Sequence, residues 1–221
     1  MARIKGNNLN SPFTGRIGNI VGCKWKDTYY IRMRPASVKH PNTVAQLAQR
    51  MRFMKSQEFL LPLKEFLRLG FGAYSSDKSP YNAAMSYTMK NSLTGDYPDI
   101  RVDPAMVLVS RGKLGCCENA SAQITDLGQI HFSWSTNLPD NSAKTNDRVI
   151  LVLRSLDDSK AMYKLDAALR SEGSVFLTQS GFKARIIACY LLFVRPSVLL
   201  GGFGEKDISD SIYCGTIQLD E

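Results

Sequence analysis

Residues 186–194, Ile-Ile-Ala-Cys-Tyr-Leu-Leu-Phe-Val, are the longest apolar run of this 221-residue chain. A run of this length cannot cross a bilayer, which takes about 20 residues, and its β-branched and aromatic content indicates a strand. From about residue 100 the chain holds a series of short β-like segments separated by turn residues such as Glu172-Gly173: 106–110, 120–125, 129–135, 148–155, 174–178, 184–195 and 211–219. This spacing predicts a seven-stranded antiparallel β-sandwich. Residues 161–170 fit either a further strand followed by a loop or a short helix.

The N-terminal part has a different pattern. Residues 17–25 and 28–35 are β-rich with Lys26-Asp27 between them, which predicts a β-hairpin, and the polar residues 1–14 are expected to form an extended arm. Thr43-Val-Ala-Gln46 fits a capping box that begins a helix, which Pro62 ends or kinks. A second helix is expected over 63–69, and a third starts at Ser79-Pro80 and ends near Gly95.

These patterns predict an α+β protein with two domains. A basic domain of residues 1–98 contains the β-hairpin plus three helices, and the sandwich occupies residues 100–221, with Tyr97–Pro104 as the boundary. The helices carry a larger apolar stripe than a lone hairpin can bury: Leu47, Met51, Met54, Phe59, Leu60 and Phe66. We expect this stripe to pack against the hairpin, the sandwich or another subunit.

Positive charge is concentrated near the start of the chain. Residues 1–55 hold eleven lysines and arginines and a single acid, Asp27, whereas the whole chain has 28 Lys and Arg against 20 Asp and Glu, a formal net charge of +8. The remainder of the chain is therefore close to neutral. A basic segment attached to a near-neutral body suggests a surface that meets a negatively charged partner.

The sequence offers little for catalysis. The only histidines are His40 and His131, and neither accompanies a nucleophile motif or a second metal ligand at suitable spacing. The five cysteines include no C-x-x-C pair, and the paired carboxylates Asp157-Asp158 lie in a turn. The Gly201-Gly-Phe-Gly204 segment lacks the helix and lysine of a phosphate-binding loop. We therefore predict no catalytic residues, no metal site, no cofactor and no small-molecule substrate.

One group of residues is a candidate binding site. Cations and an aromatic ring on the hairpin, extended by cations from the first helix, could form one partner-binding surface: Lys24, Lys26, Tyr30, Arg32, Arg34, Lys39, Arg50 and Lys55. Interleaved cations and rings suit nucleic acid, because cations offset phosphate charge and rings stack on bases. An acidic protein surface and a merely solvated face are the alternatives.

Two resemblances add to this reading. Gln129-Ile-His-Phe-Ser-Trp134, Arg185–Val194 and Ser211–Gln218 are similar to strands of a fibronectin type III or immunoglobulin-like sandwich. The whole chain, mainly residues 15–112, resembles a family of uncharacterised Bacteroidetes proteins classed as a domain of unknown function; the shared features are Gly15, Gly18, Gly22, Trp25, Arg32, Pro35, Pro41, Thr43, Gln46, Gln49, Arg50, Phe53, Tyr81–Ala84 and Val107–Gly112. His40 departs from the asparagine expected before Pro41. Similar Pro-x-Thr-x-x-Gln-Gln patterns are associated with phage-like and mobile-element proteins.

The function expected from these features is that of a non-enzymatic structural or assembly protein. It would dock through its basic N-terminal region onto a protein partner or a second copy of itself. The alternative is a sequence-tolerant nucleic-acid-binding protein. With no signal peptide or membrane span in the sequence, we expect a cytoplasmic protein without membrane contact, or one incorporated into a virion or other assembly.

Overall fold

A computed structural model describes residues 3–4, 13–25, 28–37, 42–74, 78–138, 140, 142–178, 185–201 and 204–219. The chain forms two compact units, Met1–Thr43 and Val44–Glu221. This division lies well before the expected domain boundary near residue 98. The physical reason is that the helices share a hydrophobic core with the C-terminal strands, as described below.

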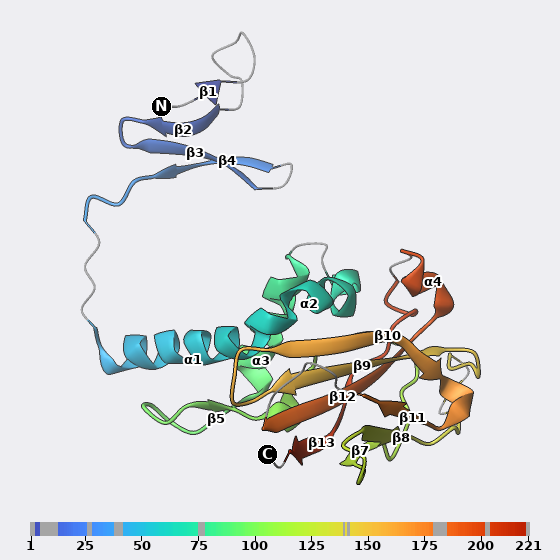
Figure 1. The fold of residues 1–221 in the computed structure, drawn as a ribbon. Helices are drawn as coiled ribbons and strands as arrows, with labels where there is room; N and C mark the ends of the chain where they lie inside the picture. The colour runs from blue at the N-terminus through green and yellow to red at the C-terminus, as the bar shows by residue number, and fades with distance from the viewer. Residues whose placement is uncertain are drawn as a thin grey trace. The chain divides into compact units, whose positions relative to one another are not determined.

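The first unit is a four-stranded antiparallel sheet in the order β1-β2-β3-β4 (Figure 1). Its strands are β1 (Arg3–Ile4), β2 (Phe13–Ile17), β3 (Ile20–Trp25) and β4 (Thr28–Met33). The β3–β4 hairpin confirms the prediction, with Trp25 paired to Thr28 across residues 26–27. The predicted extended arm instead contributes β1 and the start of β2.

Close packing explains one glycine of this sheet. Gly22 on β3 is buried, and a Cβ at this position would lie 2.4 Å from the Phe13 carbonyl oxygen and 2.6 Å from the Phe13 ring. The ring of Phe13 therefore occupies the space that any side chain at residue 22 would need.

The second unit begins with the predicted helices. They are α1 (Val44–Leu60), the 3-10 turn η1 (Leu61–Leu63), α2 (Lys64–Gly70), η2 (Gly72–Tyr74) and α3 (Pro80–Asn91). Pro62 lies in η1 and separates α1 from α2 as expected. The Ser79 hydroxyl accepts a hydrogen bond from the Asn82 amide at 3.2 Å, which confirms the predicted cap of α3.

Two larger antiparallel sheets follow in this unit. One has the order β10-β9-β12-β13, built from β9 (Arg148–Ser155), β10 (Ala161–Leu169), β12 (Ile186–Val194) and β13 (Ile212–Gln218). The other has the order β11-β8-β7, built from β7 (Ser121–Ile124), β8 (Ile130–Ser133) and β11 (Ser174–Leu177). The shorter elements are β5 (Leu93–Thr94), β6 (Arg101–Val102), η3 (Pro104–Met106), η4 (Arg170–Glu172) and α4 (Pro196–Leu199).

The four-stranded sheet β10-β9-β12-β13 is covered on both faces. Its strand β12 is the long apolar run, and residues 187–194 are all buried. Alternate residues such as Ile150 and Leu192 join a core with Phe59, Leu63 and other helix residues. Their neighbours, such as Leu151, join a second core with the three-stranded sheet, including Phe132 and Trp134. Helices, four-stranded sheet and three-stranded sheet thus form three layers (Figure 1).

A buried arginine joins the first helix to the sheet. Arg154 on β9 is 4% exposed and donates to the carbonyl oxygens of Phe59 at 2.9 Å and Glu58 at 3.1 Å. These carbonyls lie at the C-terminal end of α1, where intrahelical donors run out. Phe59, Leu60 and Phe66 of the predicted stripe join the core with this sheet, one of the three expected alternatives, whereas Met54 is 51% exposed.

Two local predictions are resolved by the structure. The expected strand over 106–110 is wrong: η3 ends at Met106, and Val109 and Ser110 donate their amides to the Ser211 hydroxyl at 2.9 and 3.4 Å. A side chain therefore replaces the ladder partner in this stretch. Residues 161–169 form strand β10, the first of the two alternatives, and η4 follows directly.

No helix in the described part of the chain combines the length and apolar content needed to cross a bilayer.

Candidate functional site

The two faces of the N-terminal sheet β1–β4 differ in chemistry. Residues paired across antiparallel strands lie on the same face. Cys23 pairs with Tyr30, and Arg32 pairs with Val21, which in turn pairs with Arg16 on β2. Trp25 lies two residues after Cys23 on β3 and therefore points to the same face. We call this surface the basic face: Arg16, Val21, Cys23, Trp25, Tyr30 and Arg32. It combines exposed cations with two aromatic rings, 53% exposed at Trp25 and 48% at Tyr30.

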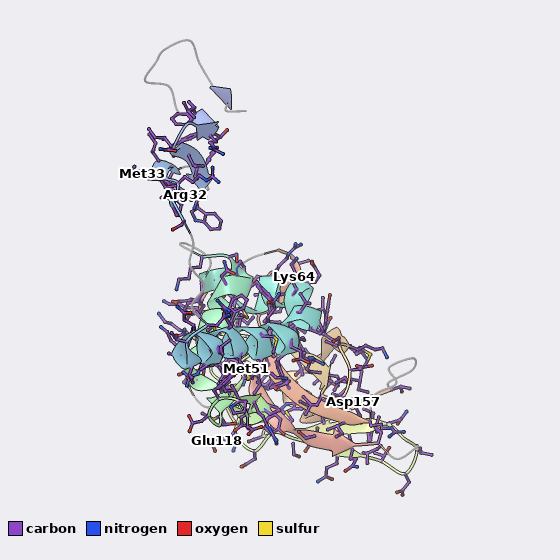
Figure 2. All side chains as sticks on the ribbon, turned by 90° about the vertical axis from the view of Figure 1, so that its left-hand side faces the viewer. Arg32, Met33, Met51, Lys64, Glu118 and Asp157 are labelled. Carbon is purple, nitrogen blue, oxygen red and sulfur yellow. The ribbon has the colours of Figure 1, made fainter. Side chains whose placement is uncertain are left out.

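The opposite face is largely apolar. It carries Ile17, Ile20, Tyr29, Ile31 and Met33, and the Ile31 and Met33 side chains are 65% and 77% exposed. Arg32 and Met33 are successive residues of β4 (Figure 2), so their side chains alternate between the two faces. We call this surface the apolar face.

Lys24 is not on the basic face. It pairs with Tyr29 and therefore shares the apolar face, where its Nζ lies 5.2 Å from the centroid of the Tyr29 ring. This cation–π contact ties the charge to its own sheet. The expected single surface containing both Lys24 and Tyr30 is therefore corrected: the sheet separates them.

The other predicted residues are distributed as follows. Arg34 follows β4, is exposed, and donates its amide to the Asn19 carbonyl at 2.8 Å. Lys26 and Lys39 lie outside the described residues. Arg50 and Lys55 belong to α1 in the second unit, where Lys55 Nζ pairs with Glu58 Oε2 at 3.3 Å. Within the described part of strands β1–β4, Tyr30 and Arg32 are the members of the predicted set that share the basic face.

Sequence reasoning missed Arg16 and Trp25 as members of the basic face. The signal was present in the sequence, because a hairpin whose strands are separated by two residues places Trp25 opposite Thr28 and hence Cys23 opposite Tyr30, as the register shows. Arg16 could be placed on this face only with knowledge of strand β2, and the first residues of β2 were expected to belong to the extended arm.

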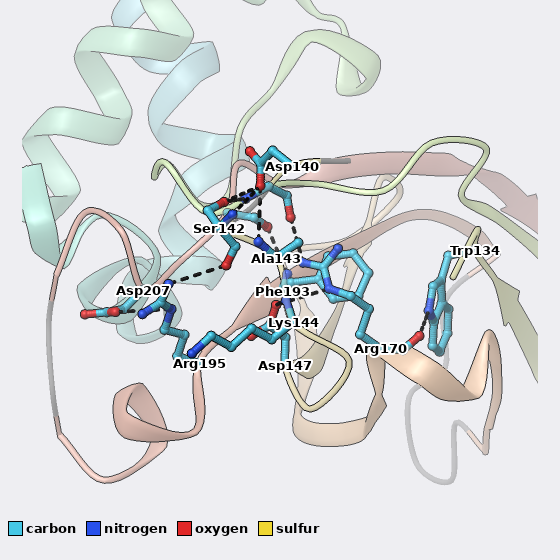
Figure 3. Close-up of polar contacts among 12 residues, drawn as sticks. Trp134, Asp140, Ser142, Ala143, Lys144, Asp147, Arg170, Phe193, Arg195 and Asp207 are labelled. Carbon is cyan, nitrogen blue, oxygen red and sulfur yellow. Dashed lines mark hydrogen bonds and ion pairs between the residues drawn. The ribbon is translucent and has the colours of Figure 1, made fainter. Parts of the chain in front are cut away.

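The second unit contains a buried ionic cluster around Arg170, drawn in Figure 3. Arg170 and Asp147 are both 0% exposed, with Nε 3.2 Å from Oδ2. The Arg170 guanidinium carbon lies 3.7 Å from the Phe193 ring centroid, and Nη2 donates to the Gly115 carbonyl at 2.6 Å. Burial lowers the pKa of Arg170, and the charge of Asp147 opposes this shift. Because both side chains are fully buried, the pair presents no charged atom to a ligand at the surface.

Trp134 and Asp140 flank this cluster. The Trp134 indole donates to the Arg170 carbonyl at 2.9 Å, which satisfies its only polar atom. Asp140 Oδ1 accepts from the Ser142 amide at 2.8 Å and from the Ala143 amide at 3.1 Å, and Ser142 Oγ in turn accepts from the Gly115 amide at 2.8 Å. The Ser142 bonds lower the pKa of Asp140.

The residues considered for catalysis have local partners. His131 stacks on Phe176 with ring centroids 4.6 Å apart. Ser155 Oγ donates to Asp157 at 2.6 Å and lowers the pKa of that carboxyl to about 2. Burial raises the pKa of the Cys117 and Cys189 thiols to about 12. Within the described ranges, no three His, Cys, Asp or Glu side chains are grouped for a metal ion.

Comparisons with known proteins give a family without an assigned activity. Residues 12–215 match the family of unknown function DUF6266. No curated protein matches the chain. No solved structure matches it either. Because the match spans most of the chain, including the N-terminal sheet from β2 onward and both sheets of the second unit, the chain belongs to the DUF6266 family of unknown function.

Proposed function

We propose that this chain is a non-enzymatic structural or assembly protein that docks through its N-terminal sheet onto a protein partner with an acidic surface. The observation that carries the proposal is the exposure of large side chains on both faces of that sheet. A small sheet of a few strands needs a packed face for stability, and contiguous exposed apolar residues mark interaction sites.

Charge supports the choice of partner. The cations of the first unit whose side chains the structure describes are Arg16, Lys24, Arg32 and Arg34, and the single acid in residues 1–55 is Asp27. An acidic protein surface would complement these cations, steer association and fix orientation. The apolar face would then supply the buried contact area.

The basic face also favours a second candidate, a sequence-tolerant nucleic-acid-binding protein. Arg16 and Arg32 would neutralise phosphates, while Trp25 and Tyr30 offer rings for base stacking. This candidate predicts binding that weakens steeply with salt.

One titration separates the two candidates. Fluorescence anisotropy of labelled poly-L-glutamate and of a single-stranded oligothymidylate, each with the full chain at about 50 and 200 mM salt, compares the two partner chemistries. Arg32→Gln should weaken binding of the correct probe, while Arg68→Gln, an exposed residue of α2 paired with Glu65, should not. Light scattering of the same variants reports any homo-oligomer. A monomer that binds neither probe would overturn both proposals.

The finer attributes rest on the resemblances. We infer that the two sheets of the second unit correspond to a fibronectin type III or immunoglobulin-like sandwich of seven strands. We infer a Bacteroidetes phage or mobile-element origin and a cytoplasmic protein that is incorporated into a virion or other assembly. The genes that flank its own gene would test this: capsid and tail genes support it, and metabolic genes oppose it.

A further inference from the structure

A cavity of about 630 Å³ lies in the second unit, and none of the residues predicted as a site belongs to its described lining. Its walls come from Phe71 and η2, from Lys78 and α3, and from two later loop residues, and they include Tyr74, Tyr87, Lys90, Arg111 and Glu205. The volume lies within the range of small-molecule sites, about 300–1,000 Å³. All of these elements belong to one compact unit.

The lining of this cavity is positively charged. Lys78, Lys90 and Arg111 face a single described carboxylate, Glu205. That carboxylate already pairs with Lys113, at 2.7 Å between Nζ and Oε2, and this contact lowers the pKa of Glu205. Among the described residues, no carboxylate lies within ion-pair distance of the three lining cations. Glu205 interacts electrostatically with Arg111, but the described lining still has three cations against one carboxylate, a net positive charge that an anionic ligand would offset.

Arg111 is held in place by two aromatic rings. Its guanidinium carbon lies 4.7 Å from the Tyr74 ring centroid and 5.8 Å from that of Tyr87. Cation–π contacts orient a guanidinium through its face and leave its N–H groups available in the plane.

The backbone around Arg111 is equally well fixed. The Arg111 amide donates to the Gly70 carbonyl at 2.9 Å, and the Gly112 amide donates to Asp210 Oδ1 at 2.9 Å. A Cβ at Gly70 would lie 2.2 Å from the Val109 carbonyl oxygen, so the end of α2 packs tightly on this segment. The cation is thus positioned before any ligand arrives, which lowers the entropic cost of binding.

We propose that this cavity binds a small phosphate-bearing ligand. The fork of Arg111 matches two phosphate oxygens, and Lys78 and Lys90 add ammonium charges around the same space. A phosphate monoester carries about −1.5 to −2 charge at pH 7, which suits several cations better than a lone carboxylate does. The Tyr87 ring adds an apolar surface for the organic part of the ligand. The site is independent of the N-terminal sheet and of the docking function proposed for it.

Calorimetric titration of the full chain with inorganic phosphate, pyrophosphate and adenosine monophosphate tests the proposal, with sodium acetate as the monovalent comparison. Arg111→Gln should weaken phosphate binding about tenfold or more, since it removes charge-assisted hydrogen bonds. Lys90→Gln should weaken binding by a smaller factor. Lys64→Gln on α2, an exposed lysine outside the cavity lining, is the matched control and should leave binding unchanged.

Amide chemical-shift mapping supplies a second readout that does not depend on the variants. Phosphate should perturb amides of 70–74, 86–91 and 111 in the unmodified chain. Absence of binding by all three phosphate probes would overturn the proposal. So would equal weakening by Arg111→Gln and Lys64→Gln, or shifts confined to the N-terminal sheet.

Discussion

Replacing Asp147 by asparagine should destabilise the second unit strongly, although the two side chains have nearly the same shape. The asparagine side-chain oxygen would still accept the hydrogen bond that Asp147 Oδ2 receives from the Lys144 amide at 2.8 Å. What is lost is the negative charge beside Arg170, whose guanidinium is fully buried. The variant therefore leaves an uncompensated charge in the core.

The magnitude follows from burial. Removing one partner of a fully buried pair costs about 3–5 kcal/mol. For a unit of this size each kcal/mol lowers the melting temperature by about 2–4 °C, so Asp147→Asn should lower it by about 6–20 °C. Thermal unfolding followed by circular dichroism, together with urea denaturation, measures both quantities.

The chain provides a matched control. Asp166 on β10 pairs with Arg148 at 3.1 Å, but the two side chains are 47% and 37% exposed. Its backbone has φ of 52°, a conformation that asparagine also tolerates. Asp166→Asn should therefore cost about 1 kcal/mol or less. If Asp147→Asn costs no more than Asp166→Asn, the buried charge pair does not exist as described and the reasoning fails.

Two further predictions concern pH and packing. The pKa of Asp157 is lowered to about 2, mainly by the Ser155 hydrogen bond, so its contribution to stability is complete above the unfolded pKa of about 3.9 and disappears as pH falls through about 2. In acid titrations, the difference in unfolding free energy between the native chain and Asp157→Asn should shrink across that window. A difference that stays constant would contradict the shift. Ile150→Ala and Leu151→Ala should each cost about 2–5 kcal/mol in urea denaturation, because both side chains are 0% exposed and face different cores; a small effect at Ile150 alone would show that the helices do not pack on the sheet.

Sequence patterns predicted helices and strands well where the residues that determine an element lie next to it in the sequence. Proline positions and the Ser79 cap marked the helices to within a few residues. The two β-rich segments on either side of Lys26-Asp27 marked the hairpin. Residues 106–110 were wrongly predicted as a strand because their apolar side chains are buried without the backbone pairing with another strand. The Ser211 hydroxyl accepts the hydrogen bonds of the Val109 and Ser110 amides, which a neighbouring strand would otherwise accept.

The candidate site was predicted less well. Counting cations along the sequence grouped Lys24 with Arg32, but strand alternation and register place them on opposite faces. The Arg111 cavity combines residues from 71 to 205, and nothing in the sequence separates these lysines and tyrosines from others that are simply solvated.

The sequence by itself determined most of the helices and strands, and that the positive charge is concentrated near the start, because spacing, turn residues and charge counts are properties of neighbouring residues. Only the tertiary structure decided which cations share a surface and which are buried. Arg154 and Arg170 illustrate the reason: each lies in the interior because carbonyls or a carboxylate far along the chain offset the cost of removing its charge from water.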